Sequence, residues 1–425
     1  MSEFKKNITD HGFIYEEIDV GDITFKSGQN EPIHRWYRLT PSYSPALVRY
    51  FIELFSVNKN SLVFDPFSGR GTTGIECQIN GIPSISTEIN PLLQEVDRRS
   101  LIWDKTNLKL IDKFIEEAQA RVQKYKKHSP EDVGRLFKTN IPNIHDVYRW
   151  WQPDVLKELM LYRSFLKNKK YCSIENYLWL AINKASLDCA NIHRNHPTIS
   201  FDDNHNRKIS VTKEISNNLR IIKKDVEGLS DLTISHSELA KSKLSNAVNI
   251  DKSLFLNKKI DYVITSPPYP NRFSYVHQTR PQLYFMELIK ERSTATEIDL
   301  EAIGGTWGRA TSVLQKELII PPLEIQKFLS FYSELSKKSI LMNNYATKYF
   351  IDMQNHITNL RKYISKDFRG AYVVGNSRLS GIEIYTEVIL GKLFEHAGFS
   401  VEKIVTFRKR LGRKKLYETA ILIKY

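Results

Sequence analysis

Apolar and polar positions follow one another along the chain with two different periods. In the N-terminal part, apolar residues recur at helical spacing over 46–55, run together over 61–64, recur at helical spacing over 72–80 and run together again at 84–86. A glycine-rich turn separates the first apolar run from the helix that follows it. Strand, turn, helix and strand in this order predict a βαβ unit with a right-handed parallel crossover.

The same alternation returns in the C-terminal part of the chain. Strands are expected over 262–264, 371–374, 401–407 and 419–423, and helices over 345–363 and 385–396. No helical pattern separates the last two strands. We therefore expect helices on a mostly parallel sheet with an antiparallel edge.

The stretch 107–245 between these parts has a mostly helical pattern without strand-turn-helix units. We interpret it as a mainly helical insertion, a candidate for target recognition, between two parts of one α/β domain, 1–106 and 246–425. The chain has 425 residues, 41% of them hydrophobic, which can fill such a core. A shorter interruption, 291–322, contains Gly304-Gly-Thr-Trp-Gly and is expected to be an excursion above the sheet, either a loop that closes over a ligand or a simple connector.

Charge and cysteine content narrow the class of protein. The formal net charge of +14 favours a polyanionic partner such as nucleic acid, although a generally basic surface explains it equally. Three scattered cysteines, Cys77, Cys172 and Cys189, form neither a disulfide framework nor a zinc spacing, which fits a cytoplasmic protein. The sequence has no secretory signal and no apolar stretch of membrane-spanning length, so no membrane role is expected.

The glycine-rich turn predicts a cofactor crevice. An apolar strand ends at Asp65, and Gly69, Gly71 and Gly74 follow where the chain must turn and let a ligand approach its backbone. Glu88 ends the next strand and suits hydrogen bonds from ribose hydroxyls. These glycines also spell GxGxxG, so a dinucleotide site is an alternative, whereas no lysine follows them as in a phosphate-binding P-loop.

The carboxylate of Asp65 favours a different cofactor. It precedes the first glycine, where it would repel a pyrophosphate but could pair with a cationic aminoacyl group. S-adenosylmethionine carries such an ammonium group. An ordinary strand-turn-helix without a ligand is the remaining interpretation.

The segment Thr265-Ser-Pro-Pro-Tyr ends a second apolar strand in a stiff corner. Each proline fixes φ and removes a backbone N–H, so the nearby carbonyls can point outward as acceptors. Ser266 Oγ and the Pro267 carbonyl could hold the two hydrogens of an exocyclic amine while Tyr269 stacks on the base. Direct methyl transfer to that nitrogen needs neither a metal nor a covalent intermediate, but a duplex base must flip out to reach the corner.

Together these segments resemble the exocyclic-amino DNA methyltransferases. Asp65-Pro-Phe-Ser-Gly-Arg-Gly-Thr-Thr is similar to their cofactor motif, Thr87-Glu-Ile-Asn-Pro to their ribose-binding segment and Thr265-Ser-Pro-Pro-Tyr to their catalytic motif. The resemblance implies a doubly wound, mostly parallel seven-stranded sheet with an antiparallel terminal hairpin, and S-adenosylmethionine as cofactor. The cofactor-binding residues would be Asp65, Pro66, Phe67, Gly69, Gly71, Thr72, Thr73, Glu88 and Asn90, and the catalytic residues Ser266, Pro267, Pro268 and Tyr269.

The resemblance also suggests the target base. Serine in the first catalytic position is usual in the family's N4-cytosine enzymes, whereas Asp or Asn is usual in its N6-adenine enzymes. The segment 34–45 is similar to the family's segment that encloses the methionine end of the cofactor, and 275–288, 371–377 and the closing hairpin are similar to its later sheet elements. C5-cytosine chemistry is not expected, because no cysteine follows a proline.

Basic and aromatic residues outside these motifs are candidates for DNA contacts. Arg408, Arg410 and Arg413 lie where the last two strands should turn and could grip phosphates, or form a solvated hairpin. His193 and Arg194, with Trp150-Trp151 before them, could read bases, although a surface loop and core aromatics explain them almost as well. The last candidate for DNA binding is Arg272, just after the catalytic motif. His193, His196 and His205 lack a credible metal spacing, so no metal is expected.

The leading hypothesis is a site-specific methyltransferase that modifies the N4 amino group of cytosine in double-stranded DNA, in the cytoplasm at the nucleoid, as part of a restriction-modification system with a cognate endonuclease. A base flipped from the duplex is its expected substrate. An N6-adenine or RNA base methyltransferase is the nearest alternative. A nicotinamide-dependent oxidoreductase and a non-catalytic DNA-binding protein remain alternatives from other classes.

Overall fold

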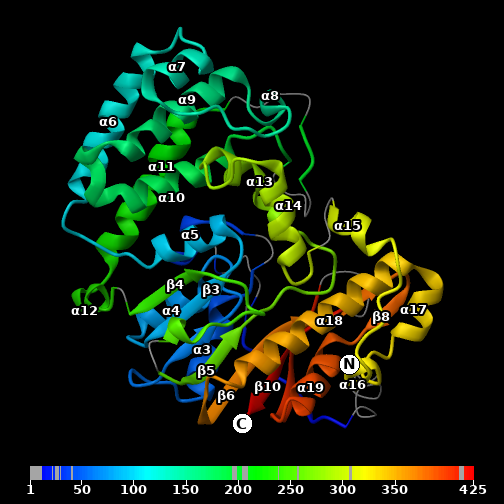
Figure 1. Cartoon of the computed structure of the whole chain (residues 1–425). Helices are drawn as coiled ribbons and strands as arrows, with labels where there is room; N and C mark the ends of the chain where they lie inside the picture. Colours follow the sequence, from blue (N-terminus) through cyan, green and yellow to red (C-terminus); the bar gives the residue numbers. More distant parts are fainter. Residues whose placement is uncertain are drawn as a thin grey trace.

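The computed structural model describes residues 12–21, 23, 28, 30–39, 42–193, 199–202, 209–237, 239–255, 258–305, 309–410 and 416–425. Its centre is an eight-stranded sheet with the order β1-β9-β10-β6-β5-β2-β3-β4 (Figure 1). The strands are β1 (Tyr15–Glu17), β2 (Val63–Asp65), β3 (Ser84–Glu88), β4 (Ala240–Leu244), β5 (Ile260–Thr265), β6 (Ile364–Gly375), β9 (Ser400–Lys409) and β10 (Tyr417–Lys424). Strand β10 is antiparallel to β9 and β6, and the other neighbouring strands are parallel.

The predicted doubly wound α/β sheet with its antiparallel terminal hairpin is confirmed, but its expected number of seven strands is wrong. The eighth strand is β1, which pairs with β9 from Tyr15↔Ile404 to Glu17↔Thr406. Its sequence, Tyr-Glu-Glu, contains no apolar run from which a strand could be predicted. Two short strands, β7 (Ser377–Leu379) and β8 (Ile382–Ile384), form a separate hairpin.

Helices cover both faces of the sheet. They are α3 (Pro45–Leu54) and α4 (Thr72–Ile79) near one face and α18 (Ile340–Leu360) and α19 (Thr386–His396) on the other. Successive residues of a strand point to opposite faces, so Val63 and Val373 pack with α3 whereas Phe64 and Tyr372 pack with α18 and α19. This alternation fixes the register of the central strands against two separate hydrophobic layers.

A large helical region follows β3 and packs above one end of the sheet (Figure 1). It begins with α5 (Pro91–Ser100), and the remaining helices are α6 (Lys109–Lys124), α7 (Pro130–Phe137), α8 (Val147–Trp150), α9 (Pro153–Arg163), α10 (Glu175–Asp188), α11 (Val211–Gly228) and α12 (Asp231–Ser235). Short 3₁₀ turns lie at Ser164–Lys167 and Lys169–Ile174. Helix α7 begins at a capping box, in which Ser129 Oγ accepts from the Asp132 amide and Asp132 accepts from the Ser129 amide.

Buried hydrogen bonds tie the helical region to the rest of the molecule. The Asp225 carboxylate on α11 accepts the Ile33 amide at 3.1 Å and the Trp36 indole N–H at 2.9 Å. Gln282 donates to the Asn183 carbonyl at 2.9 Å. These bonds border a continuous hydrophobic core shared by α5, α10 and the later helix α13 (Tyr275–Phe285). The expected stretch 107–245 also contains β4, a strand that was not expected there.

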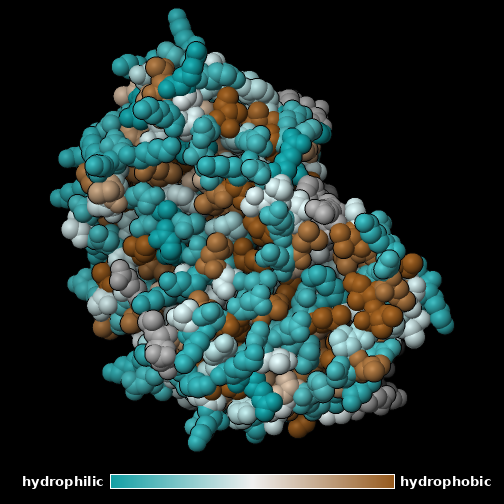
Figure 2. Space-filling model, viewed as in Figure 1, coloured by the Kyte–Doolittle hydropathy of each residue, from teal (hydrophilic) through white to brown (hydrophobic). Residues whose placement is uncertain are grey.

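Two segments after the catalytic motif differ from expectation. In the segment 275–288, compared above with sheet elements, Tyr275–Phe285 form α13 instead of a strand. The interruption 291–322 is partly helical, with α14 (Arg292–Glu301) and α15 (Arg309–Leu314). The remaining helices are α16 (Leu323–Gln326) and α17 (Tyr332–Lys338). Ile320 and Leu323 are exposed apolar residues of this part of the chain. Figure 2 shows where apolar side chains gather on one face of the molecule.

The three cysteines are free, and Cys77 and Cys189 are buried. Among the described helices, none has both the length and the apolar composition needed to cross a membrane.

Candidate active site

The sheet brings the glycine-rich turn and the proline corner together. Strands β2 and β5 are parallel neighbours, with Val63 opposite Tyr262 and Phe64 opposite Val263. Both motifs therefore leave the sheet at the same edge, outside the carboxyl ends of the strands, where open α/β sheets bind ligands. The Thr265 hydroxyl donates to Asp65 Oδ1 at 2.6 Å and joins the two motifs directly.

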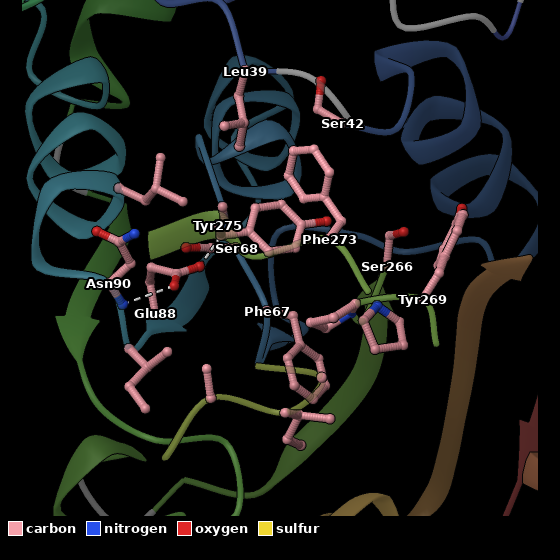
Figure 3. Close-up of a pocket in the computed structure, with 18 of the residues that line it drawn as sticks. Leu39, Ser42, Phe67, Ser68, Glu88, Asn90, Ser266, Tyr269, Phe273 and Tyr275 are labelled. Atoms are coloured by element: carbon pink, nitrogen blue, oxygen red, sulfur yellow. Dashed lines mark hydrogen bonds between the residues drawn. The ribbon is translucent and has the colours of Figure 1, made fainter. Parts of the chain in front are cut away.

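A cleft opens above this junction (Figure 3). Of the predicted cofactor residues, Pro66, Phe67, Gly69, Thr72, Glu88 and Asn90 line it, together with all four predicted catalytic residues, Ser266, Pro267, Pro268 and Tyr269. Its space, counted with its open mouth, is about 1400 Å³.

The glycine-rich turn needs glycine for two separate reasons at Gly71. This residue has φ 88° and is the N-cap of α4, and the left-handed region strongly favours glycine. A Cβ atom here would lie 2.2 Å from Asp97 Oδ1. Gly71 thus shapes the backbone of the turn and is not itself part of the cleft lining.

Asp65 differs from its expected position. Its side chain is buried, and Oδ1 accepts the Phe67 amide at 3.0 Å as well as the Thr265 hydroxyl. Burial raises the pKa of this carboxyl to about 6, and Oδ2 has no hydrogen-bond partner. The carboxylate lies behind the cleft wall, where it organises the turn, so its direct contact with an ammonium group stays a prediction.

Thr73 also faces the interior. Its hydroxyl contacts the Tyr43 hydroxyl and donates to the Ile264 carbonyl at 3.1 Å. Thr73 is completely buried and is not part of the cleft lining. Its position indicates support of the β2–α4 junction.

Glu88 lies on the cleft wall with both carboxylate oxygens engaged. The Gly69 amide donates to Oε2 and the Asn90 amide to Oε1, each at 2.9 Å. Each oxygen keeps a further lone pair for a hydroxyl donor. Burial raises the pKa of Glu88 to about 7. Asn90 caps α5 through the Leu92 amide and donates to Thr279, which anchors α13 beside the cleft.

The proline corner is held by bonds from two elements. Ser266 Oγ donates to the Val373 carbonyl of β6 at 3.0 Å. The Pro268 carbonyl accepts the Tyr349 hydroxyl of α18 at 2.8 Å. Because its proton is directed to Val373, Ser266 Oγ can offer its remaining lone pairs as an acceptor.

The terminal hairpin supplies a charged support for Tyr269. The Tyr269 hydroxyl donates to Glu418 at 3.3 Å, and Glu418 pairs with Arg408. The Arg410 guanidinium carbon lies 5.4 Å from the centre of the Tyr269 ring. Arg408 and Arg410 both line the cleft, and their expected contact with phosphates stays a prediction.

Sequence reasoning did not single out several aromatic residues of the cleft. Phe273, which precedes α13, and Tyr275, the first residue of α13, point into it (Figure 3). The signal that could have identified them is the density of aromatic residues directly after the proline corner. Gly304 also lines the cleft, and a Cβ there would lie 3.6 Å from Pro268.

The other predicted residues lie apart from this centre or outside the described residues. Arg272 is exposed, and its amide donates to the Tyr345 hydroxyl. His193 is exposed near the helical region, whereas Arg194, His196, His205 and Arg413 lie outside the described residues. From the segment 34–45, Leu39, Ser42 and Tyr43 line the cleft.

His34 is buried away from the cleft in a small charged cluster. It pairs with Glu76 at 2.8 Å, and Arg49 bridges Glu76 and Glu31. Glu31, His34 and Glu76 lie close enough together to share a metal ion, but Arg49 already supplies a cation to both glutamates. The cluster therefore has a sufficient structural explanation.

Comparisons with known proteins agree with this geometry. The family model for N6/N4 DNA methylases matches residues 23–96. The chain is 24% identical to the type II methyltransferase M.BsoBI of Geobacillus stearothermophilus, over 92% of this chain and 83% of that protein. It is 22% identical to M.AvaI of Nostoc sp., over 92% and 84% of the two chains, and 20% identical to M.MvaI of Kocuria varians, over 91% and 86%.

The matched segment contains the glycine-rich turn and Glu88, and the relatives align along nearly the whole chain, including the proline corner. These findings leave the nicotinamide-dependent oxidoreductase without support. The chain is thus similar to the N4/N6 DNA methyltransferases in its cofactor segment and to type II methyltransferases along most of its length, which supports a DNA methyltransferase with S-adenosylmethionine as its cofactor.

Proposed function

We propose that this enzyme transfers a methyl group to the N4 amino group of cytosine in double-stranded DNA, as the modifying half of a restriction-modification system. The observation that carries the choice of base is Ser266, which stands in the first position of the proline corner. Its place in the system follows from relatives that are named type II methyltransferases. A cognate endonuclease is part of the proposal.

The hydrogen bond of Ser266 determines how it can serve the reaction. Since its proton goes to the Val373 carbonyl, Oγ presents lone pairs to the cleft. An exocyclic amine donates its N–H groups to such acceptors, and their negative partial charge stabilises the positive charge that grows on nitrogen during methylation. An ionised carboxylate in place of Ser266 would have no proton to donate and would face the Val373 carbonyl oxygen with an unfavourable charge.

Tyr269 provides the surface for the flipped base. Its hydroxyl is tied to Glu418 and its ring is in contact with Arg410, so the ring cannot rotate freely within the cleft wall. A fixed ring of this kind replaces part of the stacking that a base loses when it leaves the duplex. Stacking does not discriminate among bases, so the choice of cytosine must come from groups that meet the edge of the base.

The cofactor fits the wall opposite the proline corner. The Glu88 oxygens can accept hydrogen bonds from ribose hydroxyls, and the backbone at Gly69 allows a close approach. The unpaired Oδ2 of Asp65 is a further acceptor directly behind this wall. S-adenosylmethionine supplies the electrophilic methyl group of the reaction. The role of the chain is to hold the amine and this methyl group in one cleft, away from competing water.

The experiment that tests this proposal identifies the modified nucleoside. The purified protein is incubated with unmethylated genomic DNA and methyl-labelled S-adenosylmethionine, and the digested DNA is analysed by mass spectrometry. Label in N4-methylcytosine is the expected result, and Ser266→Ala serves as the control with a weakened site. Label in N6-methyladenine would overturn the choice of base but keep the cleft assignment. Label only in an RNA substrate would overturn the choice of DNA.

A further inference from the structure

A second cavity lies between the helical region and the helix pair α13 and α14. Its wall combines three arginines with three aromatic rings, namely Arg149, Arg280, Arg292, Trp150, Phe201 and Tyr284. Its space, counted with its open mouth, is about 900 Å³. None of these six residues belongs to the cleft that holds the glycine-rich turn and the proline corner.

Aromatic rings hold two of the guanidinium groups in place. The Arg149 guanidinium carbon lies 4.1 Å from the centre of the Phe201 ring, and that of Arg280 lies 5.4 Å from the Trp150 ring. The two rings meet edge to face at 4.7 Å. A guanidinium stacked on a ring keeps its N–H groups in a defined plane, and this preorganisation favours ligands with several acceptor oxygens.

Basic side chains outnumber carboxylates in the described part of the cavity wall. Among its described lining residues, Asp146 is the only carboxylate against three arginines. Burial and the neighbouring charge of Arg292 both lower the pKa of Arg280. Burial and the charge of Arg280 likewise lower the pKa of the nearby His277 to about 4. An anion bound here would relieve the repulsion between Arg280 and Arg292.

The same two helices line both the cleft and the second cavity. On α13, Val276 faces the cleft and Arg280 faces the cavity, one helical turn or about 6 Å apart along the axis. On α14, Asp299 lines the cleft and Arg292 lines the cavity, about 10 Å apart along the axis. Successive nucleotides of one strand rise by about 3.4 Å in B-DNA, so this offset corresponds to only a few nucleotides.

We propose that the second cavity binds a backbone phosphate of the substrate DNA, a few nucleotides from the base that enters the cleft. This assignment rests on the proposed action on double-stranded DNA. Phosphate contacts fix the register of a protein on the duplex without reading its sequence. The cavity therefore sets where the target nucleotide lies relative to the proline corner, whereas base selection comes from other contacts.

The salt dependence of DNA binding tests this role. Affinity for a mixed-sequence duplex is measured by fluorescence anisotropy between 50 and 200 mM salt for the wild type, Arg292→Gln and Arg280→Gln. Each lost phosphate contact should reduce the slope of log affinity against log salt by about 0.9, which makes the loss of affinity over this range about 3.5-fold smaller. The matched control is Arg135→Gln, an exposed arginine of α7 that pairs with Asp132 outside the cavity.

The outcomes separate the possible roles. A reduced slope in the cavity variants, with an unchanged set of methylated sites and unchanged cofactor binding, supports the phosphate assignment. An unchanged slope with relaxed sequence preference would show that the arginines read a base edge and would overturn it. If both variants match the Arg135→Gln control in slope and site preference, the cavity takes no part in DNA binding. Failure of the proposed base chemistry is distinct, because it appears in the wild-type product and leaves the binding slopes unaffected.

Discussion

The substitution Gly71→Ala tests the construction of the cofactor turn. The residue has φ 88°, and the added Cβ would lie 2.2 Å from Asp97 Oδ1 and 3.2 Å from the Asp97 Cα atom. Asp97 is completely buried and accepts the Ser86 hydroxyl at 2.7 Å. Alanine can therefore be accommodated only if the backbone of the turn changes or if Asp97 moves.

Two costs add up for this variant. A non-glycine residue in the left-handed region costs roughly 1–2 kcal/mol. Displacing Asp97 breaks its bond to Ser86 and leaves a buried polar group unsatisfied, which costs about 1–3 kcal/mol. We expect the free energy of unfolding to fall by about 2–5 kcal/mol, and we expect weaker binding of S-adenosylmethionine because Gly69 and Glu88 meet in the same turn.

Urea unfolding and titration calorimetry measure these two effects. Gly228→Ala is the matched control: it ends α11, has open space around the added Cβ, and is expected to be neutral or up to about 1 kcal/mol more stable. In an Asp97→Ala background the clash is relieved, so Gly71→Ala should then cost only the backbone part, roughly 1–2 kcal/mol. Unfolding of Gly71→Ala at the wild-type urea concentration would refute this account of the turn.

Three further predictions concern the cleft. Ser266→Ala should lower kcat for methyl transfer by roughly a hundredfold, with little change in cofactor affinity. A filter-binding assay with labelled cofactor measures kcat, and an unchanged value would exclude Ser266 as an acceptor. Tyr269→Ala should cost about 1–3 kcal/mol of stabilisation of the flipped base, whereas Tyr269→Phe keeps the ring and should keep most of the activity. An equal loss of activity in both variants would point to the hydroxyl group instead of stacking. Because burial raises the pKa of Glu88 to about 7, cofactor affinity in calorimetry should weaken as the pH falls from 8 to 6, and Glu88→Gln should remove this dependence. The raised pKa of Glu88 also makes the stability of the cofactor-free protein depend on pH. The contribution of protonated Glu88 to the free energy of unfolding is fully present below pH 4.5, the ordinary pKa of the group, and is lost as the pH rises through about 7, its pKa in the folded protein.

The central strands could be predicted because their residues are mainly apolar and buried on both faces, as in β2, whose three residues are all buried. The helices were predictable from apolar residues at helical spacing, and the terminal hairpin from two apolar runs with no helical pattern between them. In contrast, β4 has the sequence Ala-Lys-Ser-Lys-Leu, whose three central residues are all polar, and β1 has the sequence Tyr-Glu-Glu with no buried residue. Edge strands carry little hydrophobic signal, so the outer limits of the sheet could not be predicted.

Most of the residues that gather at the site could be predicted from the sequence, but the directions of their side chains could not. The sequence placed Glu88 and Ser266 at the ends of two strands, which prove to be β3 and β5 on either side of β2, and both residues line the cleft. It could not show that Asp65 turns inward, because that depends on the hydroxyl of Thr265, 200 positions away in the chain. The support of Tyr269 by Arg410 likewise arises from contact between segments distant in sequence.

The chain leaves the α/β domain and returns to it at one point. The amide of Trp103, just after α5, donates to the hydroxyl of Ser237, just before β4, at 3.2 Å. A segment whose two ends meet in this way can be replaced by one of another length at little cost in loop entropy. Residues 104–236 can therefore differ in length between relatives while the catalytic sheet stays the same, provided that the side chains that pack against α5 and α13 are kept. Such a change would also have to preserve the Asp225 contacts with the chain around Trp36, since a segment without them would leave buried N–H groups unpaired.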